Sequence, residues 1–169
     1  MKAILKAPSK LWSAAHEDLA RRHPFAAERV GFFFAKAAVT GDGVLLLLAT
    51  HYEPVVDEDY VFNPQVGAMI GSEAIRKAMQ ASYKNHSALI HVHSHGGRGR
   101  PEFSATDTSG AAQFVPSFFN AVPGMPHGIV VLSGDSARGL LWTAAESKPR
   151  FLTGFVTVGD ELRRFGEER

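Results

Sequence analysis

Cysteine is missing from this chain of 169 residues. Its absence excludes disulfide bonds, a structural zinc site built on thiolates, and catalysis by a cysteine nucleophile. A chain that needs no disulfides fits a reducing compartment, so we expect this protein to reside in the cytoplasm.

The chain also has no excess of charge of either sign and no long hydrophobic run. Its 18 basic and 17 acidic residues give a formal net charge of +1, which predicts neither nucleic acid nor an acidic membrane surface as a partner. The longest apolar runs, 30–35 and 44–49, are far too short to span a bilayer. Lys6, Pro8 and Lys10 interrupt the apolar N-terminus before it reaches the length of a signal sequence.

No internal repeat, low-complexity tract or linker interrupts the sequence, so residues 1–169 are expected to form one domain. Strands interleaved with a few helices predict an α/β (α+β) fold in which helices pack against a mixed β-sheet. The helix at 104–115 should end before Pro116, 57–62 reads as a strand or an acidic loop, and the tail from Asp160 reads as a short helix or a frayed end. The remaining strands are predicted at 2–6, 29–40, 44–51, 88–95, 128–132, 139–143 and 151–158, and the remaining helices at 9–22 and 72–83.

Three histidines alternate along one apolar strand, Ile90-His91-Val92-His93-Ser94-His95. Residues two apart on a strand share a face and lie about 6–7 Å apart, so two adjacent imidazoles can converge on one ion. His91 and His95 are about 13 Å apart along the strand, too far to share it. The pair is therefore His91 with His93 or His93 with His95, and we favour the second because His95 ends the strand beside the loop that returns to Asp107.

Two histidines and an aspartate, with a fourth position left open, form a donor set typical of hydrolytic zinc sites. Ser104-Ala105-Thr106-Asp107 also has the spacing of a helix capping box, and both roles are compatible, because capping would hold Asp107 toward the histidine strand. We interpret His91 as a core histidine that is hydrogen-bonded to its neighbours, and the alternative is that it supports the metal ligands from behind.

A hydrolytic zinc site needs a carboxylate that accepts a proton from water and passes it to the leaving group. Position favours Glu28, because it immediately precedes a rigid apolar strand, whereas Glu102 lies in a loop that holds a base poorly. The other glutamates considered, on helices or in acidic segments, are Glu17, Glu53, Glu58 and Glu73.

Taken together, these motifs resemble the signature of the JAMM/MPN metalloproteases. The signature consists of a glutamate in Glu28-Arg29-Val30-Gly31 before an apolar strand, then His93-Ser94-His95, a spacer, and Ser104-Ala105-Thr106-Asp107. The resemblance covers roughly residues 1–145. It departs from the usual pattern in a spacer one residue longer and in Gly96, which stands where a proline is usual.

The resemblance implies a cytidine-deaminase-like fold and assigns roles by position. His93, His95 and Asp107 correspond to the ligands of Zn²⁺. Glu28 corresponds to the general acid/base, and Ser104 to the residue that hydrogen-bonds the tetrahedral intermediate.

The activity implied by the resemblance is cleavage of the isopeptide or peptide bond after the C-terminal tail of a ubiquitin-like protein. Such a tail would bind in an extended channel, and cognate conjugation enzymes are possible partners, as in bacterial single-domain members, some of which belong to antiphage defence operons. Asp57–Tyr60 and Gly96–Phe103 are expected to flank the channel, with Arg98 and Arg100 suited to an acidic or carboxylate-bearing partner.

Two alternatives stay open on the sequence. One is a non-catalytic MPN scaffold, although such modules typically lose ligand residues that are all present here. The other is a metallo-amidase or peptidase that acts on small substrates or on sulfur-carrier proteins.

Overall fold

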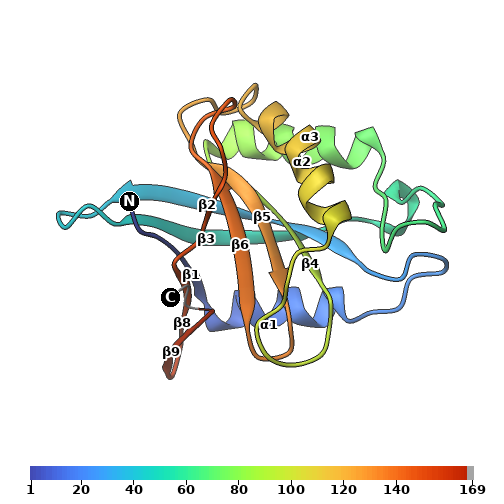
Figure 1. Cartoon of the computed structure of the whole chain (residues 1–169), viewed down its shortest axis with the longest axis horizontal. Helices are drawn as coiled ribbons and strands as arrows, with labels where there is room; N and C mark the ends of the chain where they lie inside the picture. The colour runs from blue at the N-terminus through green and yellow to red at the C-terminus, as the bar shows by residue number, and fades with distance from the viewer. Residues whose placement is uncertain (167–169) are drawn as a thin grey trace.

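The computed structural model describes residues 1–166 and is built on one curled, mixed β-sheet with helices on both faces (Figure 1). The strand order is β7-β6-β5-β4-β2-β3-β1-β8-β9. The pairs β1–β3, β1–β8 and β4–β5 are parallel and the others antiparallel, which confirms the predicted mixed α/β class. The elements are β1 (Ala3–Pro8), α1 (Ser9–Leu19), β2 (Val30–Val39), β3 (Leu45–Pro54), α2 (Ser72–Asn85), β4 (Ala88–Ser94), α3 (Ala105–Phe118), β5 (His127–Leu132), β6 (Ala137–Trp142), β7 (Arg150–Phe151), β8 (Gly154–Val158) and β9 (Leu162–Phe165).

The centre of the sheet is the long hairpin formed by β2 and β3. Its turn is closed where the Thr40 amide donates to the Val44 carbonyl over 2.9 Å, and Gly43 adopts a φ of +79°, which glycine reaches without steric cost. All of Val30–Ala35 is buried, because β2 lies between β3 and β4 and is covered on both faces. The continuous apolar run in the sequence is therefore explained by a central strand.

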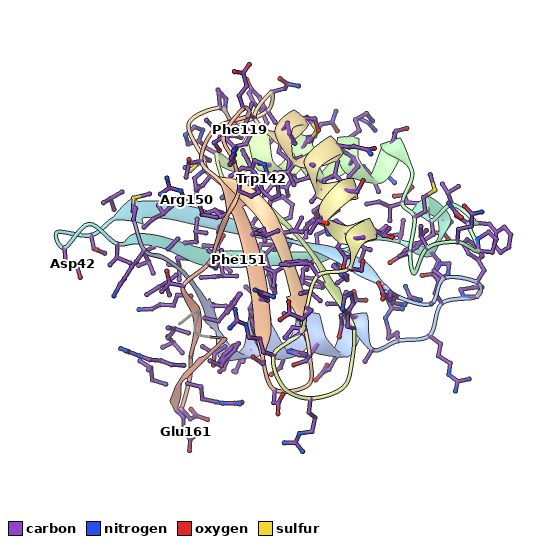
Figure 2. All side chains as sticks on the ribbon, in the orientation of Figure 1. Asp42, Phe119, Trp142, Arg150, Phe151 and Glu161 are labelled. Atoms are coloured by element: carbon purple, nitrogen blue, oxygen red, sulfur yellow. The ribbon has the colours of Figure 1, made fainter. Side chains whose placement is uncertain are left out.

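Each face of the sheet has its own hydrophobic core. On the inner face, Leu5, Phe33 and Phe155 pack with α1, where the Trp12 ring stacks on Phe33 at a centroid distance of 5.7 Å. On the outer face, residues from β2, β4, β5 and β6 pack beneath α2 and α3, including Trp142 (Figure 2). The histidines of β4 point to this second face, because they alternate with Ile90 and Val92, which belong to the inner core.

Several predicted elements differ from the structure. α3 continues through Pro116 to Phe118, since a proline near the end of a helix costs only one backbone hydrogen bond and the chain closes its last turn from the Phe119 amide to the Pro116 carbonyl over 3.3 Å. Of the two alternatives for residues 57–62, the structure has the acidic loop, which contains a 3₁₀ turn at Asp57–Asp59 and a single bridge between Tyr60 and Ile70.

The C-terminal region also departs from expectation. The strand predicted at 151–158 is divided into β7 and β8, because the chain passes from the β6 edge of the sheet to the β1 edge between them. The segment after Asp160, predicted as a short helix or frayed end, pairs with β8 as β9, and residues 167–169 lie outside the described part. Within residues 1–166, no helix combines the length and apolarity needed to cross a bilayer.

Candidate metal centre

His93 and His95 lie at the end of β4, on the face covered by α3. Their Nε2 atoms are 3.1 Å apart, so the strand geometry converges the two imidazoles as predicted. The His93 side chain is buried, whereas the His95 side chain is 26% exposed and faces the opening of the site. The site therefore has one ligand-type nitrogen anchored in the core and one at its mouth.

Asp107 reaches the two imidazoles from the first turn of α3. Its Oδ1 lies 3.3 Å from His93 Nε2 and its Oδ2 lies 3.3 Å from His95 Nε2. The predicted capping box is present: Ser104 Oγ accepts from the Asp107 amide over 3.1 Å, and Asp107 Oδ2 accepts from the Ser104 amide over 2.7 Å. Helix capping thus holds the carboxylate in a fixed rotamer toward β4.

The groups around Asp107 favour the ionised form of its carboxyl group. Burial alone would raise the pKa of the Asp107 carboxyl, but hydrogen bonding to His93, the charge of that imidazole and the two bonds to Ser104 together lower the pKa below its ordinary value. A carboxylate that stays charged beside two imidazole nitrogens is a suitable ligand for a cation.

Glu28 lies on the other side of His95, just before β2. The antiparallel register pairs Val30 with His93, and continuing it by two residues places Glu28 opposite His95. Glu28 Oε1 lies 3.9 Å from His95 Nε2, and one ligand-type atom each from Glu28, His93 and His95 lie within 4.8 Å of one another. Three segments distant in sequence therefore bring four ionisable side chains together.

The segment that carries Glu28 is held by contacts that sequence analysis missed. The amides of Ala27 and Glu28 both donate to the Gly67 carbonyl, over 2.8 and 3.0 Å. A Cβ on Gly67 would lie 2.7 Å from Glu28 Cδ, so only glycine leaves room for this carboxylate. The neighbouring Arg29 side chain is buried and donates to Asp57 Oδ1 over 2.6 Å and to the Arg22 carbonyl over 2.8 Å.

No local sequence signal reveals either contact. Gly67 lies in a loop of unremarkable composition, and Arg29 is one arginine among many. Gly67 contacts the Glu28 segment, and Arg29 contacts Asp57. In each pair the two residues are distant along the chain and meet only in the folded protein.

The donor geometry fits a small divalent cation. Tetrahedral coordination with bonds of about 2.0–2.1 Å requires donor atoms about 3.3 Å apart. His93 Nε2 lies 3.1 Å from His95 Nε2 and 3.3 Å from Asp107 Oδ1, whereas the 3.3 Å contact of His95 Nε2 is to the other oxygen, Asp107 Oδ2; Glu28 Oε1 lies 3.9 Å from His95 Nε2. Glu28, His93 and His95 each place a donor atom within 4.8 Å of the others, and Asp107 contacts both imidazoles, so these four side chains are the candidate ligands of a cation.

The site opens into a cleft of about 1150 Å³ between the segment 63–70 and the start of α3. The charged cluster lines one part of the cleft, and the remaining walls are mostly apolar. The apolar wall residues are Val30, Val66, Ala68, Met69, Ile70, Ile75, Phe114 and Ile129. This arrangement can hold an extended chain with its reacting bond beside the cluster.

His91 differs from the hydrogen-bonded core histidine that we expected. Its ring lines the inner part of the cleft beside Phe114, at a centroid distance of 5.0 Å, and its buried Nδ1 has no hydrogen-bond partner among the described residues. Burial lowers the pKa of His91 to about 3, so the ring is neutral at physiological pH.

The segments expected to flank the channel do not line the cleft. Asp57 is paired with the buried Arg29, and Arg98 pairs with Asp135 over 3.3 Å. Glu102, the second candidate for the base, instead pairs with Arg138. In the described part of the chain, the walls come from 63–70 and 104–114 instead, because the 96–103 loop is tied to the β5–β6 turn.

Comparisons with known proteins add little to this picture. No protein-family model matches the chain, and neither does any curated protein. Among solved structures, the chain is similar to the N-terminal domain of STIL from Trichoplax adhaerens, with a TM-score of 0.40 and 9% sequence identity. The match covers 82% of this chain and 41% of that one, so this chain spans less than half the length of its structural neighbour.

Proposed function

We propose that this protein is a zinc-dependent hydrolase of the JAMM/MPN type that cleaves the peptide or isopeptide bond after the C-terminal tail of a ubiquitin-like protein. The observation that carries the proposal is the convergence of His93, His95 and Asp107 at ligand spacing with Glu28 beside them. A complete ligand set with an adjacent carboxylate favours catalysis over a scaffold role.

In this proposal, His93, His95 and Asp107 hold Zn²⁺. The bound ion supplies a Lewis acid and lowers the pKa of water toward neutrality. Glu28 takes a proton from the attacking water and passes it to the leaving nitrogen as the carbon–nitrogen bond breaks. Ser104 Oγ accepts from the Asp107 amide, and its hydroxyl, which interacts with the Asp107 carboxylate, would turn to donate to the oxygen that becomes negatively charged.

The cleft supports an extended polypeptide as the substrate. Its walls are mostly apolar, and its volume of about 1150 Å³ is larger than a small amide substrate requires. Glu28 and the imidazoles line this cleft, so the bond after a narrow, extended tail would reach them. A ubiquitin-like conjugation pathway, such as one in bacterial antiviral defence, would supply proteins with such tails.

Metal content provides the first test. The purified protein should contain about one equivalent of zinc by elemental analysis, and His95→Ala or Asp107→Ala should abolish it because each removes a ligand. Glu28→Gln should retain the metal. The Co²⁺-substituted variant should have the same absorption spectrum as the Co²⁺-substituted protein with Glu28. Loss of metal from Glu28→Gln would instead make Glu28 a ligand.

Activity provides the second test. A folded ubiquitin-like protein with a dye amide at its C-terminus should be cleaved faster than the tail peptide alone, and Glu28→Gln should lower kcat about 10²–10⁴-fold. Equal rates on the two substrates would favour a small-substrate amidase. A metal-loaded protein that cleaves neither would favour a scaffold.

A further inference from the structure

The outer face of β3, β1, β8 and β9 carries an ordered row of side chains remote from the metal centre. The strand register aligns Lys36 with Leu48, Leu48 with Lys6, Lys6 with Val156, and Val156 with Arg164. Cations thus alternate with aliphatic residues across five strands. Neighbouring strands are about 4.8 Å apart, so successive cations are about 10 Å apart.

An apolar row runs beside the first. Ala38 is aligned with Leu46, and Leu46 with Ile4. Together the rows border a hollow of about 500 Å³ whose basic lining residues are Lys2, Lys6 and Arg164.

This face is partly open to solvent: Ile4 and Leu46 are half-buried and Val156 is buried, whereas Leu48 and Leu162 are exposed. The hydrophobic core beneath α2 and α3 draws its strand residues from β2, β4, β5 and β6, and α1 packs on the inner face (Figure 1). Leu48 is accordingly 41% exposed and Leu162 59% exposed. Exposed aliphatic side chains bordered by charged ones are a feature of surfaces that another molecule covers.

The acidic residue that interacts with this face is Asp42, whose pKa is lowered by its hydrogen bond with Thr40 and, less strongly, by the charge of Lys2. Lys36 donates to the Asn85 and His86 carbonyls at the end of α2, but no carboxylate of residues 1–166 forms an ion pair with Lys2, Lys6 or Arg164. Asp42 is the acidic residue in the lining, and it lies at the tip of the β2–β3 hairpin, where its carboxylate accepts from Thr40 (Figure 2).

We propose that this face docks an acidic, leucine-rich segment of a partner protein. Carboxylates would meet Lys2, Lys6 and Arg164, while aliphatic side chains cover Ile4, Leu46 and Leu162. A second copy of this chain is disfavoured, because a two-fold contact would oppose the same cations. A nucleic acid is also a poor match for this face, because proteins bind nucleic acids through many phosphate contacts and this hollow offers three cations among aliphatic side chains.

The proposal goes beyond the hydrolase function and does not depend on it. The probe is a fluorescein-labelled peptide of about 14 residues built from glutamate and leucine, whose binding is measured by fluorescence anisotropy at low and high salt. We expect salt-sensitive binding, and Lys6→Glu with Arg164→Glu should weaken it at least about tenfold.

The matched control is Lys84→Glu with Lys148→Glu, which changes the net charge equally at exposed sites elsewhere on the surface. It should change the affinity by less than about twofold. Leu48→Ser should also weaken binding, and methyl NMR shifts should map to Ile4, Leu46 and Leu162.

Three outcomes would overturn the proposal: no binding of the peptide, equal weakening by both double variants, or tighter binding of single-stranded DNA or anionic vesicles than of the peptide. Hydrolysis of the dye amide should be unchanged in Lys6→Glu/Arg164→Glu. The docking surface and the hydrolase function can therefore fail separately.

Discussion

At the scale of single residues, the candidate site depends on a glycine that has no chemistry of its own. Gly67 accepts two amide hydrogen bonds from the Glu28 segment and leaves the space that the Glu28 carboxylate occupies. The atoms that a Cβ would meet belong to the flexible end of Glu28, so the carboxylate would move before the backbone does.

Gly67→Ala should therefore lower kcat about tenfold to a hundredfold while leaving the fold intact, because misplacing a catalytic group by about 1 Å has an effect of this size. Steady-state kinetics measures the loss, and the Co²⁺ spectrum should be unchanged, since the ligands are untouched. Gly41→Ala is the control, because a Cβ there meets nothing within 4 Å. Equal kcat in the two variants would show that Gly67 does not position Glu28.

At the scale of the elements, helix ends decide where functional groups point. The N-terminus of α3 aims Asp107 at the imidazoles through its capping box. α2 ends at His86, which has a φ of +44°. This left-handed backbone conformation is strained for histidine and is the one that glycine usually supplies at the end of a helix.

His86→Gly should raise the free energy of unfolding by roughly 0.5–1 kcal/mol, because glycine reaches the left-handed region without steric cost. Urea denaturation monitored by circular dichroism measures the change. Asn85→Gly, one residue earlier and still helical, should instead destabilise by a similar amount. A destabilised His86→Gly would indicate that the imidazole contributes contacts that outweigh backbone strain.

At the scale of the whole molecule, His127 connects three parts of the fold. Its Nδ1 accepts from the Leu89 amide of β4 over 2.9 Å, and its Nε2 donates to the Val122 carbonyl after α3 over 3.0 Å. The ring is fully buried against Phe119, and burial lowers its pKa. The neutral imidazole is thus the form that the folded state requires.

Because the unfolded chain binds a proton at this histidine more readily than the folded chain does, the free energy of unfolding should fall as the pH falls below about 6.5. Asn at this position can accept from the Leu89 amide but does not titrate. His127→Asn should be less stable at pH 7, with a shallower loss of stability between pH 7 and 5. Denaturation curves at several pH values test this, and parallel profiles for the two proteins would exclude His127 as a contributor.

Features that depend on short-range patterns could be predicted from the amino-acid sequence. Alternation placed His93 and His95 on one face, glycines marked the β2–β3 hairpin, and Ser104 with Asp107 formed the cap that their spacing predicts. The mixed α/β class followed from the same local periodicities.

Only the tertiary structure decided which distant segments meet. The β2–β4 register set Glu28 opposite His95, and the packing of α3 on the sheet brought Asp107 to the imidazoles. The cleft wall at 63–70 and the pairing of β9 were not predictable for the same reason. Strand register and packing arise from contacts between residues far apart in the chain, and no local pattern specifies them.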